Sequence, residues 1–456
     1  MSVVVIFLAL ALLILGAYRG MSVLLLSPVL AVLAAVLTGG PALASYTQVF
    51  MTATGGFVIA FFPLFLLGAV FGRVMEESGA ARSLARGIAR GVGPRNAILA
   101  VVLACAALTY GGVSLFVVAF AAWPLARALF HETQTPARLI PATIALGAFT
   151  FTMTALPGSP QIQNAIPMPF FGTTAFAAPG LGLVAAGVML GLGQLWLTFR
   201  ARRLAAAGEG GPDAAAGPGD AALPPLWVAA LPVVLVVAAT YVAGAQVLPG
   251  IGADYLAEPL YGGTTLPRVI GLWAVISALV LSILVALALN LGRLPRPGET
   301  LSRGAEASLL PVFNTASLVG FGAVIAATPG FEAIRAALDG LAAGNLPLSL
   351  ALAAGTLAGI TGSASGGMSI ALDALGADYM ARALAEGTSP ELLHRVVAVA
   401  TGGLDTLPHN GAVVTLLGIC GMTHRQAYGD IFVVAVLGPL VACAAIIALG
   451  STFGAF

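Results

Sequence analysis

Two polar stretches with prolines interrupt an otherwise apolar chain, and both carry side chains that can bind a small anion or a proton. The first reads "TALPGSPQIQNAIP" (154–167) and the second "GGLDTLPHNGAVV" (402–414). Proline has no N–H, so carbonyl groups one turn earlier in the chain lose their partners. The helix that follows begins with free N–H groups and the positive end of its dipole. We expect the helix starts to suit an anion and the freed carbonyls to suit a cation or a proton relay.

The side chains of the two breaks fall into two groups. Asp405 is the most deeply placed acid and, with His409 and Asp373, is a candidate for carrying a coupling proton. Asp405 could instead cap the backbone at the break, His409 could be a neutral hydrogen-bonding residue, and Asp373 could lie at the outer rim. The candidate substrate-binding residues of the breaks are Thr154, Ser159, Gln161, Asn164, Thr406 and Asn410, and the prolines that break the helices are Pro157, Pro160 and Pro408.

A second group of hydroxyls surrounds two glycine-rich tips, "LTYGGVS" (108–114) and "ITGSASGGMS" (360–369). Single Ser and Thr residues often cap exposed backbone or allow helices to approach closely. Their recurrence at both tips favours a hydroxyl-lined binding site. The candidate substrate-binding residues of the tips are Thr109, Gly111, Gly112, Ser114, Thr361, Ser363, Ser365 and Ser369.

The stretch before the first tip is too short to cross a bilayer. As a helix, Ala97–Leu108 would span about 18 Å, against about 30 Å of hydrocarbon. A helix that stops at a glycine turn and returns is a re-entrant hairpin, which is tolerated only inside protein or beside water. We expect such hairpins at about 97–130 and 346–377.

Composition sets the class of the protein. Of the 456 residues, 59% are hydrophobic and 8% charged, and the apolar runs are long and continuous. This indicates a polytopic α-helical membrane protein, because a membrane barrel reads as short alternating strands.

The net charge of +1 makes nucleic acid an unexpected partner. Cys105, Cys420 and Cys443 form no spaced pair and are expected in the core. We expect no catalytic site, no metal site and no cofactor.

The segment 200–225 is rich in Ala, Gly and Pro and is predicted to be a flexible cytoplasmic linker between two homologous transmembrane halves, 1–199 and 226–456. Short motifs recur in order about 250 residues later, among them Gly111-Gly112-Val113-Ser114-Leu115 with Gly366-Gly367-Met368-Ser369-Ile370, and Leu156-Pro157 with Leu407-Pro408. Each half then has three spans, a surface helix (80–95 and 331–343), a hairpin, a proline-broken helix (138–170 and 393–421) and a last span.

Five crossings per half would invert the second half relative to the first. With the N-terminus outside, most arginines fall inside, as the positive-inside rule requires, and Arg268, Arg335, Arg382 and Arg395 fall outside. His131, His394 and His424 are expected in loops without a special role. The predicted fold is therefore an all-α polytopic membrane protein with two inverted-topology repeats, each with a re-entrant hairpin and a proline-broken helix. Discontinuous helices that meet near the midplane are a design of secondary transporters.

An intramembrane protease and an anion channel are the two other classes of function that the sequence suggests. "GSAS" (362–365) suggests an intramembrane serine protease, but no Gly-x-Ser-Gly, Gly-x-Ser-x-Gly or zinc motif accompanies it. An anion channel could be lined by the two half-helices, but a channel does not need two inverted gates.

Three segments carry a resemblance to a known family: "FFPLFLLGAVFGRVMEESGAA" (61–81), "TALPGSPQIQNAIPMPFFGT" (154–173) and "ITGSASGGMSIAL" (360–372). Across nearly its whole length the sequence resembles the gluconate permease family of proton-coupled organic-acid symporters. Where sugar-acid permeases carry a His-Pro-Gly-Pro type motif, this chain reads Leu156-Pro157-Gly158-Ser159-Pro160, which looks more like the branch assigned to D-3-hydroxybutyrate.

The resemblance implies uptake of a small hydroxy-monocarboxylate with protons across the bacterial inner membrane. Na⁺ coupling is the alternative, since hydroxyls and carbonyls at the tips also suit Na⁺. The expected partners are thus a small organic anion with protons or Na⁺ and the lipid bilayer, and a homodimer is compatible with the sequence.

Overall fold

The computed structural model describes residues 2–19, 21–93, 96–113, 115–213, 223–341, 344–408 and 410–456, and all regular structure in these ranges is helical. The predicted all-α polytopic fold is confirmed. Two candidate site residues, Ser114 and His409, lie outside the described ranges.

The elements of the first half are α1 (Ser2–Tyr18), α2 (Val23–Leu37), α3 (Ala42–Ala44), a π-helical turn (Ser45–Phe50), α4 (Met51–Glu77), α5 (Ala80–Val92), α6 (Ala97–Tyr110), α7 (Leu115–Glu132), a 3-10 turn (Ala137–Leu139), α8 (Ile140–Ala148), α9 (Phe151–Thr154), α10 (Ile162–Ala165), α11 (Pro167–Phe171) and α12 (Pro179–Ala206).

The elements of the second half are α13 (Leu226–Val242), a π-helical turn (Ala243–Val247), 3-10 turns (Leu248–Gly250, Asp254–Ala257, Pro259–Tyr261), α14 (Leu266–Asn290), a 3-10 turn (Leu291–Arg293), α15 (Pro297–Ala326), α16 (Phe331–Leu341), α17 (Leu346–Thr361), α18 (Ala364–Glu386), α19 (Pro390–Leu404), α20 (Gly411–Cys420), α21 (His424–Phe432), a π-helical turn (Val433–Leu437) and α22 (Gly438–Phe453).

In the described part of the chain, 7 helical stretches are long and apolar enough to cross a membrane: Ala42–Glu77, Ala137–Thr154, Pro179–Ala206, Leu226–Gly250, Leu266–Arg293, Pro297–Ala326 and His424–Phe453. With 17 and 15 residues, α1 and α2 are shorter than the about 20 residues of a typical span, although the sequence analysis counted both as spans. The predicted linker begins later than expected, because α12 continues as a helix to Ala206.

The long helices α4 and α15 form the most extensive helix pair of the fold. A methyl group on Gly304, near the start of α15, would lie 2.7 Å from Cα of Val70, near the end of α4. Close to the other end of α15, Gly320 packs on Thr54, near the start of α4. The two helices therefore run antiparallel, and the two glycines allow their backbones to approach closely.

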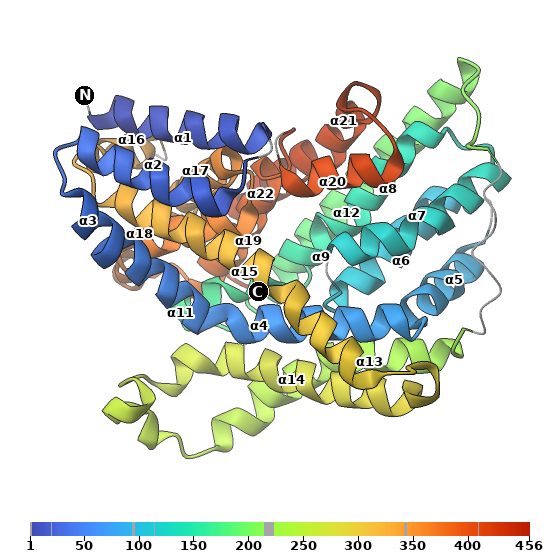
Figure 1. Ribbon diagram of the computed structural model, residues 1–456, viewed down its shortest axis with the longest axis horizontal. Helices are drawn as coiled ribbons and strands as arrows, with labels where there is room; N and C mark the ends of the chain where they lie inside the picture. Colours follow the sequence, from blue (N-terminus) through green and yellow to red (C-terminus); the bar gives the residue numbers. More distant parts are fainter. Residues whose placement is uncertain are drawn as a thin grey trace.

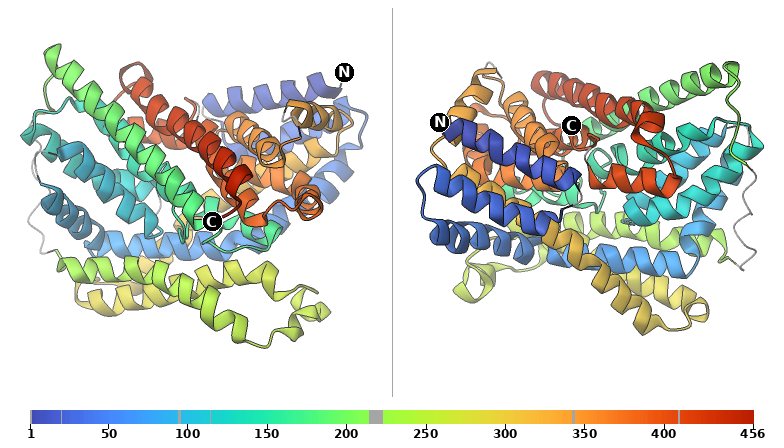
Figure 2. Two further views of the ribbon diagram at one scale, coloured as in Figure 1. Left: turned by 180° about the vertical axis from the view of Figure 1, so that it is seen from behind. Right: turned by 45° about the horizontal axis from the view of Figure 1, so that its top comes forward.

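The remaining helices are arranged around this pair in matching ways. Helix α2 of the first half packs on α15 of the second half, and α14 of the second half packs on α4 of the first half. The pair α13–α14 lies along the lower edge of Figure 1, and in the left view of Figure 2 its connection, residues 243–265, also lies at the lower edge. Each half also contains a helical hairpin, α6–α7 or α17–α18, packed on the broken helix of the same half.

Candidate functional site

Both helices break where the prolines predict. In the first half the chain is irregular from Ala155 to Gln161, between α9 and α10, and in the second half it is irregular from Asp405 to Pro408 and at Asn410, between α19 and α20. We call these segments the first break and the second break. The helices that follow differ in length, since α10 has 4 residues and α20 has 10.

Each break is tied to the hairpin tip of its own half by a side-chain amide. In the first half, Nε2 of Gln161 donates to the backbone oxygen of Thr109 at 2.6 Å and to that of Val113 at 3.4 Å. In the second half, Nδ2 of Asn410 donates to the backbone oxygen of Gly362 at 3.0 Å. The same type of contact therefore recurs in both halves, and it uses carbonyl groups that a bound cation could otherwise have used.

A second contact holds the first tip in place. The hydroxyl of Tyr110 donates to the backbone oxygen of Pro157 at 2.6 Å. At the tip Gly112 has a φ of 90°, a conformation that favours glycine, and a methyl group there would lie 3.2 Å from Cγ of Pro160. The glycine of the tip and the proline of the break are therefore in close contact.

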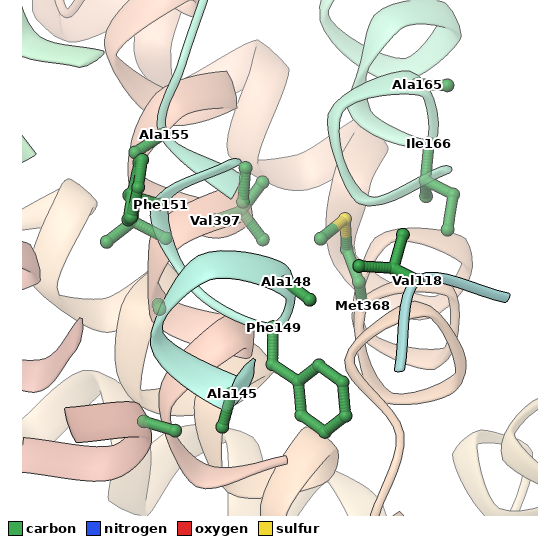
Figure 3. Close-up of a cluster of buried hydrophobic side chains, with 14 of the residues drawn as sticks. Val118, Ala145, Ala148, Phe149, Phe151, Ala155, Ala165, Ile166, Met368 and Val397 are labelled. Carbon is green, nitrogen blue, oxygen red and sulfur yellow. The ribbon is translucent and has the colours of Figure 1, made fainter. Parts of the chain in front are cut away.

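The two breaks also meet each other. A methyl group on Gly402, in the last turn of α19, would lie 2.6 Å from Cγ2 of Thr154. The outgoing arm of each hairpin contacts the helix after the break in the other half, α7 with α20 and α18 with α10 and α11. Figure 3 shows Val118 and Ile166 of the first half in one buried cluster with Met368 and Val397 of the second. The structure thus brings both breaks and both hairpins into a single interlocked centre.

Most of the predicted hydroxyls are engaged with the protein itself. Ser159 donates to the backbone oxygen of Thr152, Thr154 to that of Thr150, and Thr406 to that of Ala435. At the second tip, Thr361 donates to the backbone of its own helix and Ser363 accepts from the N–H of Gly366. Ser365 lies 3.4 Å, oxygen to oxygen, from the hydroxyl of Ser363. The capping alternative therefore accounts for much of this group.

Among the predicted hydroxyls that the structure describes, two are buried and have no hydrogen-bond partner. They are those of Thr109, at the end of the incoming arm of the first hairpin, and Ser369, in the outgoing arm of the second. Oε1 of Gln163, which the sequence analysis did not select, is a buried acceptor without a partner. A buried polar group without a partner costs about 1–3 kcal/mol, so these atoms are available to a ligand.

The N–H groups predicted to bind an anion after Pro408 are not free. Oδ1 of Asn410 accepts hydrogen bonds from the N–H groups of Ala412 and Val413, at 2.6 and 3.1 Å. Asn410 is therefore the N-cap of α20 and occupies the site expected for a carboxylate. The prediction that this helix start is open to a substrate was wrong. The Asn410 amide caps the N–H groups of α20 through its oxygen and binds the tip carbonyl of Gly362 through its nitrogen.

Asp405 lies in the second break, immediately after α19. Its carboxylate interacts with the N–H groups of Ala364 and Thr406, which places it beside the N-terminus of α18. Its Oδ1 is buried and has no hydrogen-bond partner. Asp373, in contrast, is exposed on α18, outside the two break segments. Of the candidate proton carriers in the described ranges, Asp405 alone lies at a break.

The sequence analysis missed a buried basic pair. His394 and Arg395 lie on α19 and are both fully buried, so the expectation that His394 lies in a loop was wrong. Nη1 of Arg395 donates to the backbone oxygen of Thr154 and to Oδ1 of Asn164, both at 3.1 Å. His394 lies between Oδ1 of Asn164, at 3.2 Å, and the hydroxyl of Thr173, at 2.6 Å. The signal was an ionisable pair inside an apolar run.

A shallow apolar groove of about 320 Å³ lies away from the breaks, between α12 and the C-terminal helix. Its lining residues are Leu192, Leu195, Trp196, Phe199, Val433, Leu437, Gly438 and Val441. Among the described residues no group of three His, Cys, Asp or Glu side chains could hold a metal ion.

Two known proteins that are similar in sequence or in fold are named as transporters. No protein-family model matches the sequence. The crystal structure of the YdaH transporter of Alcanivorax borkumensis, described as having an unusual topology, matches 90% of each chain with a TM-score of 0.52 and 19% identity, a similarity of fold alone. The "uncharacterized transporter YxjC" of Bacillus subtilis is 43% identical over 472 aligned positions that cover 100% of both chains. The chain belongs to the same transporter family as YxjC.

Membership in this family fits the arrangement of the breaks. A multi-pass membrane transporter needs polar groups at the centre of its apolar fold. In the part of the chain that the structure describes, such groups lie at the two breaks and the two tips. The relative YxjC also argues against the serine protease alternative, since it is named as a transporter.

Proposed function

We propose that the protein is a secondary active transporter that takes up a small hydroxy-monocarboxylate, of the gluconate and D-3-hydroxybutyrate class, together with protons across the bacterial cytoplasmic (inner) membrane. The observation that carries this proposal is Asp405, an acid at a helix break inside an apolar fold, with one buried carboxylate oxygen that has no hydrogen-bond partner in the described part of the chain. An ionisable group in that position is costly unless it has a function.

The unpartnered polar atoms suggest how such a substrate binds. The hydroxyls of Thr109 and Ser369 can donate to a carboxylate, and Oε1 of Gln163 can accept from a substrate hydroxyl. A small substrate with both an acidic and a hydroxyl group offers partners for donors and acceptors alike. Asp405 would take up the coupling proton from one side and release it on the other.

Alternating access in this proposal rests on inverted repeats. Two helices at equivalent places in the repeats, α4 and α15, pack antiparallel through Gly304 and Gly320, as an inverted pair would. The matching packing of α2 on α15 and α14 on α4 supports the same symmetry.

Na⁺ coupling is the second candidate. Tip carbonyls are suitable Na⁺ ligands, but those of Thr109, Val113 and Gly362 already accept hydrogen bonds from Gln161 and Asn410. Protons are therefore favoured over Na⁺ at the tips.

The test is uptake of labelled D-3-hydroxybutyrate and gluconate into proteoliposomes under three separate conditions: an inward proton gradient, an inward Na⁺ gradient and no gradient. We expect accumulation above the external concentration with the proton gradient only. Accumulation with Na⁺ alone would favour the second candidate. Equilibration without accumulation under every gradient would indicate a channel and would contradict the proposal.

A further inference from the structure

Arg395 carries a positive charge into the interior of the protein, where no carboxylate is paired with it. In the described part of the chain no ion pair to Arg395 is formed, and the groups that interact with it electrostatically are His394, Tyr110 and Glu391. Glu391 is at the exposed start of α19. A buried charge without such a pair requires other compensation.

That compensation comes from oxygen atoms of the first half. Nε and Nη2 of Arg395 donate to the backbone oxygen of Ala177 at 3.1 and 2.7 Å, and Nη1 donates to the backbone oxygen of Thr154 and Oδ1 of Asn164. We call these three acceptors the oxygen cage. Carbonyl and amide oxygens that converge in this way are the usual ligands of small cations.

Hydrogen bonds within the first half hold the oxygen cage in shape independently of the guanidinium of Arg395. Nδ2 of Asn164 donates to the backbone oxygens of Ser159 and Ala175, each at 2.9 Å. Its Oδ1 must therefore point the other way, toward Arg395 and His394. Since Oδ1 can only accept, Nε2 of His394 carries the proton and Nδ1 accepts from Thr173. At Gly182 of α12 a methyl group would collide with the backbone oxygen of Ala155 beside the cage.

The two breaks carry opposite charges at non-equivalent positions. If Leu156-Pro157 is matched to Leu407-Pro408, the residue equivalent to Asp405 is Thr154, and the residue equivalent to Arg395 is Ile144, which is fully buried. The first break thus has no acid of its own and receives an arginine from α19. The second break has an acid, and the residue of α8 that is equivalent to Arg395 is apolar.

We propose that Arg395 is a resident cation of the first break: its guanidinium fills an oxygen cage that would otherwise take an exchangeable monovalent cation. The first half then binds no coupling ion, and the charge there is constant through the transport cycle. Where the proposed function holds, coupling is left to Asp405 alone, and this last step rests on that proposed function. Arg395 is a positioning residue, because its contacts are to residues on either side of the first break rather than to the substrate.

The test removes the guanidinium and measures whether the empty cage binds a cation. The variant is Arg395→Ala, with Arg268→Ala at an exposed position as the matched control. Thermal unfolding of the purified proteins is followed without substrate in low-millimolar guanidinium chloride, NaCl or choline chloride. We expect guanidinium to raise the Tm of Arg395→Ala by about 4 °C relative to choline and to leave the wild type and the control unchanged. A response no larger than that of the wild type would overturn the proposal.

A second set of variants covers the case in which Arg395→Ala does not fold. Arg395→Lys keeps a charge that can bind carbonyl oxygens, whereas Arg395→Met fills the space without charge. We expect the Lys variant to fold and to retain most of the uptake, and the Met variant to lose at least about tenfold, which corresponds to about 1.4 kcal/mol. Equal behaviour of the two variants would overturn the proposal. The unfolding experiment uses neither substrate nor a proton gradient, so it decides the role of Arg395 even if the proposed substrate or coupling ion is wrong.

Discussion

Nη1 of Arg395, on α19, donates a 3.1 Å hydrogen bond to Oδ1 of Asn164, in the short helix that follows the first break. The bond joins the broken helix of the second half to that of the first. Together with the contact between Gly402 and Thr154, it makes the two breaks one structural unit. A substitution on one side of this unit should therefore affect the stability and the transport function of the other side.

The amides that tie each break to its tip should matter for transport beyond their contribution to stability. We expect Gln161→Leu and Asn410→Leu each to lower kcat/KM for uptake by about tenfold or more, because one buried hydrogen bond is worth about 1 kcal/mol and its loss also frees the tip. The control is Asn345→Ala, which removes the N-cap of α17 and costs about 1 kcal/mol of stability at an end remote from the breaks. Uptake by Asn345→Ala should match the wild type. Equal loss of uptake in all three variants would mean that stability alone is affected.

The two unpartnered hydroxyls should act on substrate affinity and not on folding. Thr109→Val and Ser369→Ala remove hydroxyls that bond to nothing in the protein, so the Tm should stay the same or rise. If these hydroxyls bind the carboxylate, KM should rise by about tenfold for each, as expected for about 1.4 kcal/mol. Thr401→Val is the matched control, because the hydroxyl of Thr401 donates to the backbone oxygens of its own helix. An unchanged KM in both test variants would remove these two residues from the site.

The contact between the breaks leaves no room for an added methyl group. Gly402→Ala places a Cβ 2.6 Å from Cγ2 of Thr154, and overpacking of this kind costs about 1–3 kcal/mol. Thr154→Ser removes the opposing methyl group and should restore the Tm and uptake of Gly402→Ala in the double variant. Gly55→Ala on α4 is the control, since a methyl group there meets nothing within 4 Å. A double variant as damaged as Gly402→Ala alone would show that the breaks do not meet in this way.

Local patterns were sufficient to predict the all-α fold. Prolines and glycines act within a few residues, so Pro157, Pro160 and Pro408 located both breaks and the glycine-rich tips located both hairpins. Continuous apolar runs identified the long helices in the same way. The short helices α1 and α2 were counted as spans because composition does not define where a helix ends.

The partners of polar side chains could not be predicted, because they come from distant segments. Asn410 was expected to bind substrate, yet its amide caps α20 and reaches Gly362 at the tip. Arg395 was expected on the outer side of the membrane from the count of crossings, and its acceptors Thr154 and Ala177 lie more than two hundred residues earlier. The rule that an ionisable residue in an apolar run marks function was applied to Asp405, and it applied equally to Arg395.

The most direct test of the account is the transport of substrate by Asp405→Asn in two assays on the same proteoliposomes. Exchange of labelled for unlabelled hydroxy acid needs binding and alternating access only, whereas accumulation driven by a proton gradient also needs the coupling proton. Because Asn keeps the shape of Asp but cannot carry the proton, we expect exchange within about threefold of the wild type and no accumulation above equilibrium. Accumulation by Asp405→Asn at the wild-type level under the same proton gradient would contradict the central claim.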